Sequence, residues 1–265
     1  MPASTPKAGW FLPMTLFKPC IVVPHFDHVA QFRCSLPALL RQGLPLLVVD
    51  DASPPEVFRE LEALLAESAP DAMLLRRERN GGKGAAVWTG LNAAARAGFT
   101  HALQIDADGQ HDADAAPRFI AAGRGMPEAL ICGRPVFDHS ISKLRYYGRF
   151  LTLFPSWLTS LSTGIKDAMC GFRLYPLQQS LALRALNRYN GRMGFDPEIL
   201  VRAVWAGIPL KFLDVAVRYP EEGRSHYHYL RDNVEIAWMH LRLLGGMLLR
   251  LPVLLWRKLP RNRPA

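Results

Sequence analysis

Short apolar runs rich in valine, isoleucine and leucine alternate with helical stretches along the chain. This alternation predicts a mainly parallel sheet with crossover helices, which is an α/β fold. The expected strands are residues 20–23, 46–49, 72–76, 101–105, 131–134 and 210–218. The expected helices are residues 29–42, 55–66, 83–97, 115–122 and 230–256, and residues 171–206 are expected to be largely helical.

Acidic residues directly follow two of the expected strands. Asp50 and Asp51 end the second apolar run, and Asp106-Ala107-Asp108 ends the fourth. In open parallel sheets ligands bind outside the carboxyl ends of the strands, so these acids indicate a ligand site at that edge. One acid of the first pair could accept hydrogen bonds from a ribose or a base. Either could equally cap the next helix, for which Ser53 is the expected N-cap.

The segment from Asp106 to His111 has the residue types of a site for a hard divalent cation. Two carboxylates two residues apart can offer oxygen ligands to Mg²⁺ or Mn²⁺, and the amide oxygen of Gln110 can add a third. A loop of solvated acids, or an acid capping the next helix, would have the same sequence. Asp112 and Asp114 are interpreted in this second way, as cap residues.

Residues 80–86 form a glycine-rich turn with Lys83 at the start of an expected helix. The turn fits neither the Walker phosphate loop nor the dinucleotide fingerprint, because Arg77, Gly84 and Val87 stand where those patterns need other residues. A lysine at a helix N-terminus suits an anion. A tight turn that only permits close packing explains the segment equally well.

Charged residues in the second half of the chain are candidates for substrate contacts. Arginine suits bidentate contact with phosphate, and Asp196 and Glu198 could contact substrate or accept a proton. A helix that starts near Pro197 explains these two acids equally well. The candidate arginines are Arg134, Arg145, Arg149, Arg173, Arg218 and Arg224.

The formal net charge of +9 is concentrated near the C-terminus. Residues 224–265 hold eight Lys and Arg and two acids, which makes a local charge of +6. A nucleic-acid binder would spread basic and aromatic residues over a surface, so this class is disfavoured. The same segment is rich in Leu and Trp and is expected to lie in a membrane interface. The alternative is a terminal helix packed on the domain.

No secretory leader is expected from the N-terminal residues. No membrane-spanning helix is expected either, because glycine, arginine and proline interrupt the apolar residues 243–256. The four cysteines lack metal-finger spacing and are expected to be reduced thiols of a cytosolic chain.

Seven short motifs occur in order along the chain. They are Val22-Val23-Pro24, Val49-Asp50-Asp51-Ala52-Ser53, Asn80-Gly81-Gly82-Lys83-Gly84-Ala85, Asp106-Ala107-Asp108-Gly109-Gln110-His111, Gly133-Arg134, Asp167-Ala168-Met169-Cys170-Gly171-Phe172-Arg173 and Gly223-Arg224-Ser225-His226. Together they resemble the family 2 glycosyltransferases, and most closely the branch of dolichyl- and polyprenyl-phosphate sugar transferases. The resemblance spans about residues 18–230.

The resemblance implies a GT-A fold, a nucleotide-diphosphate sugar donor, an inverting transfer to a lipid-linked acceptor, and Mg²⁺ or Mn²⁺ as cofactor. The implied metal ligands are Asp106, Asp108 and Gln110. The implied donor site comprises Pro24, His25, Asp27, Asp51, Lys83, Asp106 and Arg224, and the implied acceptor site comprises Arg134, Arg145 and Arg149. The chain departs from the family pattern at residues 25–27, where relatives often carry an aromatic residue and Asn, and at Gly109, where most carry Leu.

The candidate catalytic residues are Asp108, Asp167 and Asp196. A lipid phosphate is already a nucleophile and needs no strong base, whereas a hydroxyl acceptor would need Asp167 or Asp196 to take its proton. The competing enzyme class is a sugar-phosphate nucleotidylyltransferase. That class should show a glycine-rich signature after the first strand, and residues 24–27 contain none.

The expected organisation has three parts. Residues 1–17 form an N-terminal extension, residues 18–229 the catalytic domain, and residues 230–265 an amphipathic, basic segment at the membrane interface. The expected location is the cytoplasmic face of the inner membrane, with the protein attached peripherally.

Overall fold

The computed structural model describes residues 17–137, 143–185, 191–218 and 229–258. One seven-stranded sheet has the order β3-β2-β1-β4-β6-β5-β7. The strands are β1 (Pro19–His25), β2 (Leu46–Asp50), β3 (Met73–Arg76), β4 (His101–Gln104), β5 (Leu130–Phe137), β6 (Arg173–Pro176) and β7 (Leu210–Val217). The helices are α1 (Val29–Leu40), α2 (Pro55–Ser68), α3 (Lys83–Arg96), the 3₁₀ turn η1 (Ala113–Ala115), α4 (Ala116–Gly125), α5 (Lys143–Ser160), α6 (Leu177–Ala185), α7 (Phe195–Ala206) and α8 (Tyr229–Trp256).

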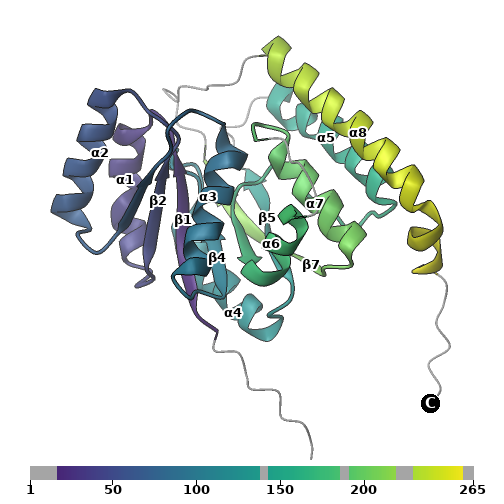
Figure 1. Ribbon diagram of the computed structural model, residues 1–265, viewed down its shortest axis with the longest axis horizontal. Helices are drawn as coiled ribbons and strands as arrows, with labels where there is room; N and C mark the ends of the chain where they lie inside the picture. The colour runs from purple at the N-terminus through teal and green to yellow at the C-terminus, as the bar shows by residue number, and fades with distance from the viewer. Residues whose placement is uncertain (1–16, 138–142, 186–190, 219–228, 259–265) are drawn as a thin grey trace, which may run out of the picture.

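The direction of the strands determines where a site can form. β1 pairs in parallel with β2 and β4, and β2 pairs in parallel with β3. Their carboxyl ends therefore meet at one edge of the sheet (Figure 1). Only β6 runs against its neighbours β4 and β5, among the strands that the structure describes.

Helices cover both faces of the sheet, and the central strand supplies both cores. Side chains alternate between the faces along a strand. Val22 accordingly joins the core under α3 and α7, while Ile21 and Val23 join the core under α1, α2 and α4. Helix α8 packs on α5 and α7 at the edge farthest from α2 (Figure 1).

The expected α/β fold is confirmed, and every expected strand forms. The expectation for residues 171–206 was wrong in part, because Arg173–Pro176 is strand β6. All four residues of this strand are buried between β4 and β5. So short a run has too few residues to show the two-residue period of a strand.

Two expected helix caps were wrong. Ser53 does not cap α2, whose N-cap is Pro54. The Ser53 hydroxyl instead accepts a hydrogen bond from the Asp27 amide, and its own amide donates to Asp50. Asp112 does cap a helical segment, the 3₁₀ turn η1, but Asp114 accepts hydrogen bonds from Arg41 and Gln42 of the α1 end instead.

Residues 233–256 of α8 are long and apolar enough to cross a membrane, judged by length and composition alone. The interrupting Arg, Gly and Pro residues do not remove this segment from the candidates, and the expectation that no helix spans a membrane stays a prediction. The four cysteines are free thiols, as expected. The proposed division at residues 17 and 230 stays a prediction.

Gly90 allows α3 to approach the central strand. A Cβ atom at this position would lie 2.3 Å from Cγ1 of Val22 and 3.2 Å from Cγ2 of Val49. We predict that Gly90→Ala lowers the free energy of unfolding by about 1–3 kcal/mol, because both contacts lie in the core. The matched control is Gly148→Ala in α5, where no atom lies within 4 Å and alanine should be neutral or favour the helix. Urea unfolding followed by circular dichroism measures both, and equal stability of the two variants would contradict this packing.

His240 on α8 should make the stability depend on pH. Both of its ring nitrogens are buried without a hydrogen-bond partner among the described residues, and burial lowers its pKa from 6.5 to about 4. The unfolded chain therefore binds more protons than the folded one between these values, so stability falls as the pH drops through this window. We predict that His240→Leu loses less stability than the parent between pH 7 and pH 5 in urea unfolding. An equal loss in both proteins would refute the assignment.

Candidate active site

The ends of β1 and β2 are joined by a buried pair, His25 and Asp50. Nδ1 of His25 lies 3.2 Å from Oδ1 of Asp50, and both side chains are fully buried. Burial alone would raise the pKa of Asp50, but hydrogen bonds from His25 and Ser53 hold it below its usual value. Asp50 thus fixes the strand ends, and Asp51 is left to face the next turn.

Asp51 binds the glycine-rich turn. Its carboxylate accepts hydrogen bonds from the backbone amides of Gly81 and Gly82, at 3.1 and 2.6 Å, and forms an ion pair with Arg77. Gly82 has a φ of +85°, a conformation that glycine adopts most readily, and α3 begins directly after it. The amides of this turn are therefore already bound to a protein carboxylate.

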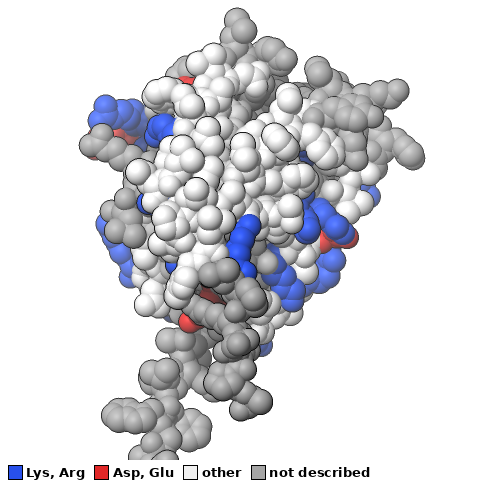
Figure 2. All heavy atoms as spheres, turned by 90° about the vertical axis from the view of Figure 1, so that its right-hand side faces the viewer, with Lys and Arg blue, Asp and Glu red and all other residues white. Residues whose placement is uncertain are grey.

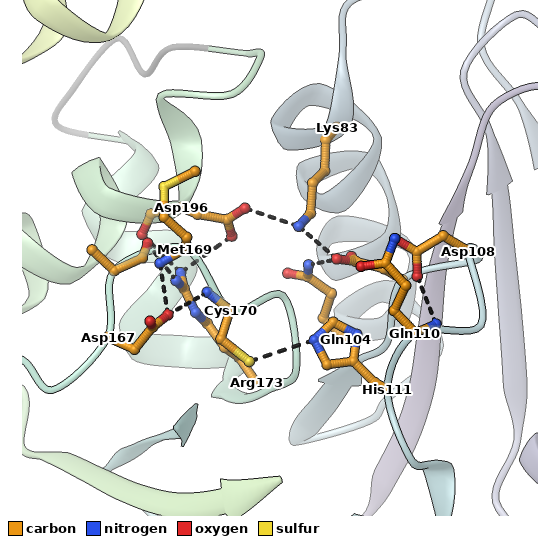
Figure 3. Close-up of polar contacts among 12 residues, drawn as sticks. Lys83, Gln104, Asp108, Gln110, His111, Asp167, Met169, Cys170, Arg173 and Asp196 are labelled. Carbon is orange, nitrogen blue, oxygen red and sulfur yellow. Dashed lines mark hydrogen bonds and ion pairs between the residues drawn. The ribbon is translucent and has the colours of Figure 1, made fainter. Parts of the chain in front are cut away.

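Lys83, the first residue of α3, links two acids that lie far apart in the sequence. Its Nζ lies 2.8 Å from Oδ2 of Asp106 and 2.8 Å from Oδ2 of Asp196 (Figure 3). Burial alone would lower the pKa of Lys83, but the two carboxylates raise it above its usual value, so the ammonium stays charged. Asp106 follows β4 and Asp196 lies in the first turn of α7. The Lys83 side chain therefore connects the end of β4 with the start of α7.

The other oxygen of Asp106 is held from the strand beneath it. Burial opposes its charge, but Lys83 lowers the pKa of Asp106, and Nε2 of Gln104 donates to its Oδ1 at 3.1 Å. Oε1 of Gln104 in turn accepts a hydrogen bond from the Tyr175 hydroxyl at 3.0 Å. Gly171 lies directly against Asp106, because a Cβ atom on Gly171 would be 2.1 Å from Oδ2 of Asp106.

Asp108 completes the acidic pair. Burial, and then the negative charge of Asp106, raise the pKa of Asp108. Its Oδ1 accepts a hydrogen bond from the backbone amide of Gln110 at 3.0 Å, and Figure 3 shows the side chains of Asp108 and Gln110 beside each other. Two carboxylates that repel each other in a partly buried site fit a divalent cation with oxygen ligands. The described residues contain no group of three His, Cys, Asp or Glu that could hold a metal, so a ligand would have to supply further oxygens.

Arg173 lies beneath the site and not in it. The side chain is fully buried, and its guanidinium donates to the backbone oxygens of Asp196 and Ala168 at 2.9 and 3.1 Å. It also lies 3.4 Å from Oδ1 of Asp196. The interpretation of Arg173 as a substrate-facing arginine was therefore wrong, and its role is to support the α7 start.

Two other expected site arginines are paired with acids. Nε and Nη2 of Arg149 donate to the two oxygens of Asp167 at 2.9 and 2.8 Å, and Asp167 also accepts from the amide of Cys170. Arg134 makes an equally bidentate contact with Asp214 at 2.6 and 2.9 Å in an exposed position, and the hydrogen bonds to Asp214 raise the pKa of Arg134. Arg149 and Asp167 therefore form a unit separate from Arg134.

The remaining predicted residues lie around the same edge or outside the described residues. Pro24 stands in β1 opposite Val49, and Asp27 follows that strand with a φ of +55°. The side chain of Arg145 and the whole of Arg224 lie outside the described residues. Their roles stay predictions.

Sequence reasoning missed three residues of this arrangement. Arg77 pairs with Asp51, while Gln104 and Tyr175 form the chain of hydrogen bonds below Asp106. For Arg77, the only signal in the sequence was the pair of adjacent cations, Arg76 and Arg77, at the end of the third strand. Gln104 is a polar residue at the end of the buried strand β4, which could have indicated the hydrogen bonds below Asp106.

Comparisons with known proteins assign the family. The profile described as glycosyl transferase family 2 matches residues 20–178. An undecaprenyl-phosphate mannosyltransferase of Micrococcus luteus is 30% identical over 210 residues, which cover 73% of this chain and 82% of that one. A dolichyl-phosphate beta-glucosyltransferase of Trichomonas vaginalis is 28% identical, with 64% of this chain covered. There the match spans about half of the relative's length, 53%.

Solved structures confirm the GT-A-like fold. Glucosyl-3-phosphoglycerate synthase from Mycobacterium tuberculosis, crystallised with Mn²⁺, uridine diphosphate and glucosyl-3-phosphoglycerate, has a TM-score of 0.60 and 16% identity. The match covers 88% of this chain and 78% of that one.

The family match decides between the enzyme classes that the residues left open. It confirms the expected glycosyltransferase and favours neither a nucleotidylyltransferase nor a nucleic-acid binder. The relatives named above also match the branch that the seven motifs resemble. The chain belongs to glycosyl transferase family 2.

Proposed function

We propose that this enzyme transfers a sugar from a nucleotide-diphosphate sugar to a polyprenyl-phosphate-like lipid, with inversion at the sugar carbon. The observation that carries the proposal is the cluster of Lys83, Asp106, Asp108 and Asp196 at the carboxyl edge of the sheet. The printed names of the relatives support it, because they describe transferases that act on undecaprenyl or dolichyl phosphate.

Asp106 and Asp108, with the Gln110 amide oxygen, are the residues that would hold Mg²⁺ or Mn²⁺. When bound there, the cation would supply positive charge for the departing nucleoside diphosphate. The two carboxylates fit this role. Burial and repulsion by Asp106 raise the pKa of Asp108, and the positive charge of a bound cation would lower that pKa again.

The chain's own cations and strand ends would bind the donor. Lys83 is charged and already fixed between Asp106 and Asp196, so it can meet diphosphate without losing side-chain freedom on binding. The glycine-rich turn is occupied by Asp51, so it positions Lys83 rather than binding phosphate through its amides. Pro24, His25, Asp27 and Asp51 at the ends of β1 and β2 would border the nucleoside.

The paired acids favour an acceptor that arrives already ionised. Asp167 is bonded to Arg149, and Asp196 is bonded to Lys83 and lies beside Arg173. Neither carboxylate is therefore placed as an unpaired base for a hydroxyl. A phosphate acceptor needs no base, and Arg149, held in place by Asp167, is suited to bind it together with Arg134, Arg145 and Arg224. Such an acceptor would be met at the cytoplasmic face of the membrane.

Asp108→Asn should abolish sugar transfer. The amide cannot replace the carboxylate as a hard anionic ligand, so we expect a loss of about 100-fold or more. Asp114→Asn is the control, because the exposed Asp114 carboxylate contacts Arg41 and Gln42 just after α1, and its replacement should leave the rate unchanged. Radiolabelled sugar transfer to a polyprenyl phosphate measures both. Full activity of the Asp108→Asn variant, or of the parent in excess chelator, would refute the metal assignment.

Ligand-dependent unfolding should identify the donor without an acceptor. A nucleotide sugar that binds the folded state raises the melting temperature, and at a fixed concentration the rise is larger for a tighter ligand. We expect one member of a panel of UDP- and GDP-sugars to raise it more with Mn²⁺ than without, in the parent and in the Asp114→Asn variant but not in the Asp108→Asn variant. A shift that is equal in all three proteins would mean that the nucleotide binds without the acidic pair.

A further inference from the structure

Helix α8 has apolar side chains on two opposite sides. One side packs on the domain, where Met239, Leu243, Met247 and Leu254 are buried. The other side is turned to solvent, with Trp238 61% exposed and Leu249 84% exposed. Its exposed apolar residues are Val234, Trp238, Leu241, Leu248, Leu249, Val253, Leu255 and Trp256. A helix that only packed on its domain would need the first side alone.

Two arginines of α8, and Arg257 directly after it, contact the rest of the domain. Arg242 lies 3.7 Å from the buried carboxylate of Glu198 in α7. Arg250 lies 4.9 Å from the ring centre of Trp205, and Arg257 donates to the Trp205 backbone oxygen at 2.7 Å. In a surface helix of a soluble protein the charged side chains face the water and the apolar ones the domain. Here these arginines are exposed but contact the domain, and much of the outer surface is apolar.

Helix α5 continues this surface. Its exposed residues Phe150, Leu151, Phe154 and Leu158 have helical spacing, and Leu151 is 77% exposed. Helix α5 packs directly on α8, and Figure 2 shows a broad uncharged area on this side of the molecule with Lys and Arg at its margins. We call these exposed residues of the two helices the α5–α8 face. Exposed apolar areas of this kind indicate an interaction site.

Beyond the start of α8, where Asp232 and Glu235 stand, the charges along the two helices have one sign. Helix α5 contains no acid, and residues 236–265 contain none either. The same stretch holds Arg242, Arg250, Arg257, Lys258, Arg261 and Arg263. At the end of α5 the face has a hollow of about 590 Å³, lined by Phe154, Trp157, Leu158, Leu161, Ser162, Thr163 and Lys258. An irregular apolar surface with a basic margin matches a fluid layer of acyl chains below anionic headgroups.

We propose that the α5–α8 face docks on an anionic bilayer, with α5 as an equal partner of α8. The helix α8 lies in the plane of the interface and does not cross the bilayer. Crossing would separate Met239, Leu243 and Met247 from the core and would bring Arg242 and Arg250 into hydrocarbon, which is costly. The proposal deepens the proposed function, because docking would present the lipid-linked acceptor beside Arg149, the residue before Phe150.

Vesicle binding by the full-length protein tests this docking without any sugar donor or acceptor. We expect binding to mixed phosphatidylcholine and phosphatidylglycerol vesicles in co-sedimentation. Leu151→Glu and Phe154→Glu in α5, and Leu249→Glu in α8, should each weaken it about tenfold or more, because a charge replaces an inserted apolar side chain. The matched control is Met126→Glu, since Met126 is an exposed apolar residue after α4 and outside the α5–α8 face. It should bind like the parent.

Three outcomes would overturn the proposal. Unchanged binding of both α5 variants would leave α8 as the sole anchor, and equal binding to pure phosphatidylcholine would remove the role of charge. A dimer in light scattering that Leu151→Glu dissociates would make the α5–α8 face an interface between two copies. Melting temperatures of the variants should equal that of the parent because these side chains are exposed. Transfer to a short, soluble acceptor phosphate reports the proposed function separately.

Discussion

The contact between Lys83 and its two carboxylates is the interaction on which the candidate site depends. One ammonium at the start of α3 holds Asp106 after β4 and Asp196 at the start of α7. Without it, the partly buried carboxylate of Asp106 and the buried carboxylate of Asp196 would lose the cation that lies between them. Burial of unpaired charge is among the costliest arrangements in a protein. The order of the strands, the glycine-rich turn and the tight packing at Gly171 all place this ammonium.

Much of this architecture could be predicted from the sequence because its signals are local. Apolar runs give the parallel strands, and acids after the runs give the edge at which the site forms. Local signals do not show which distant residues pair. Asp51 has the residue type of a helix cap or a ribose ligand, yet it binds two glycine amides about thirty positions later. Arg173 has the residue type of a phosphate ligand, yet it is buried beneath α7, and only the fold could show this.

The C-terminal helix shows the same limit in another form. Its arginines and its Leu and Trp residues were visible in the sequence, but composition alone does not say which side chains face water and which contact protein. The structure shows that Arg242 and Arg257 contact α7, while Trp238 and Leu249 are exposed. Helix α5 was not among the expected helices, and its part in this surface could not be predicted, because a surface shared by two helices has no signature in either one.

The ion pair between Glu198 and Arg242 has a further consequence. Glu198 lies two residues after Asp196 in α7, so one helical turn bears both the acid that meets Lys83 and the acid that meets α8. With the α5–α8 face on a bilayer, this turn would act as a spacer of fixed length between the plane of the headgroups and the reacting groups. The enzyme would then select acceptors by the distance of their phosphate from the bilayer surface. It would accept phosphates at one such distance and exclude those held closer or farther away.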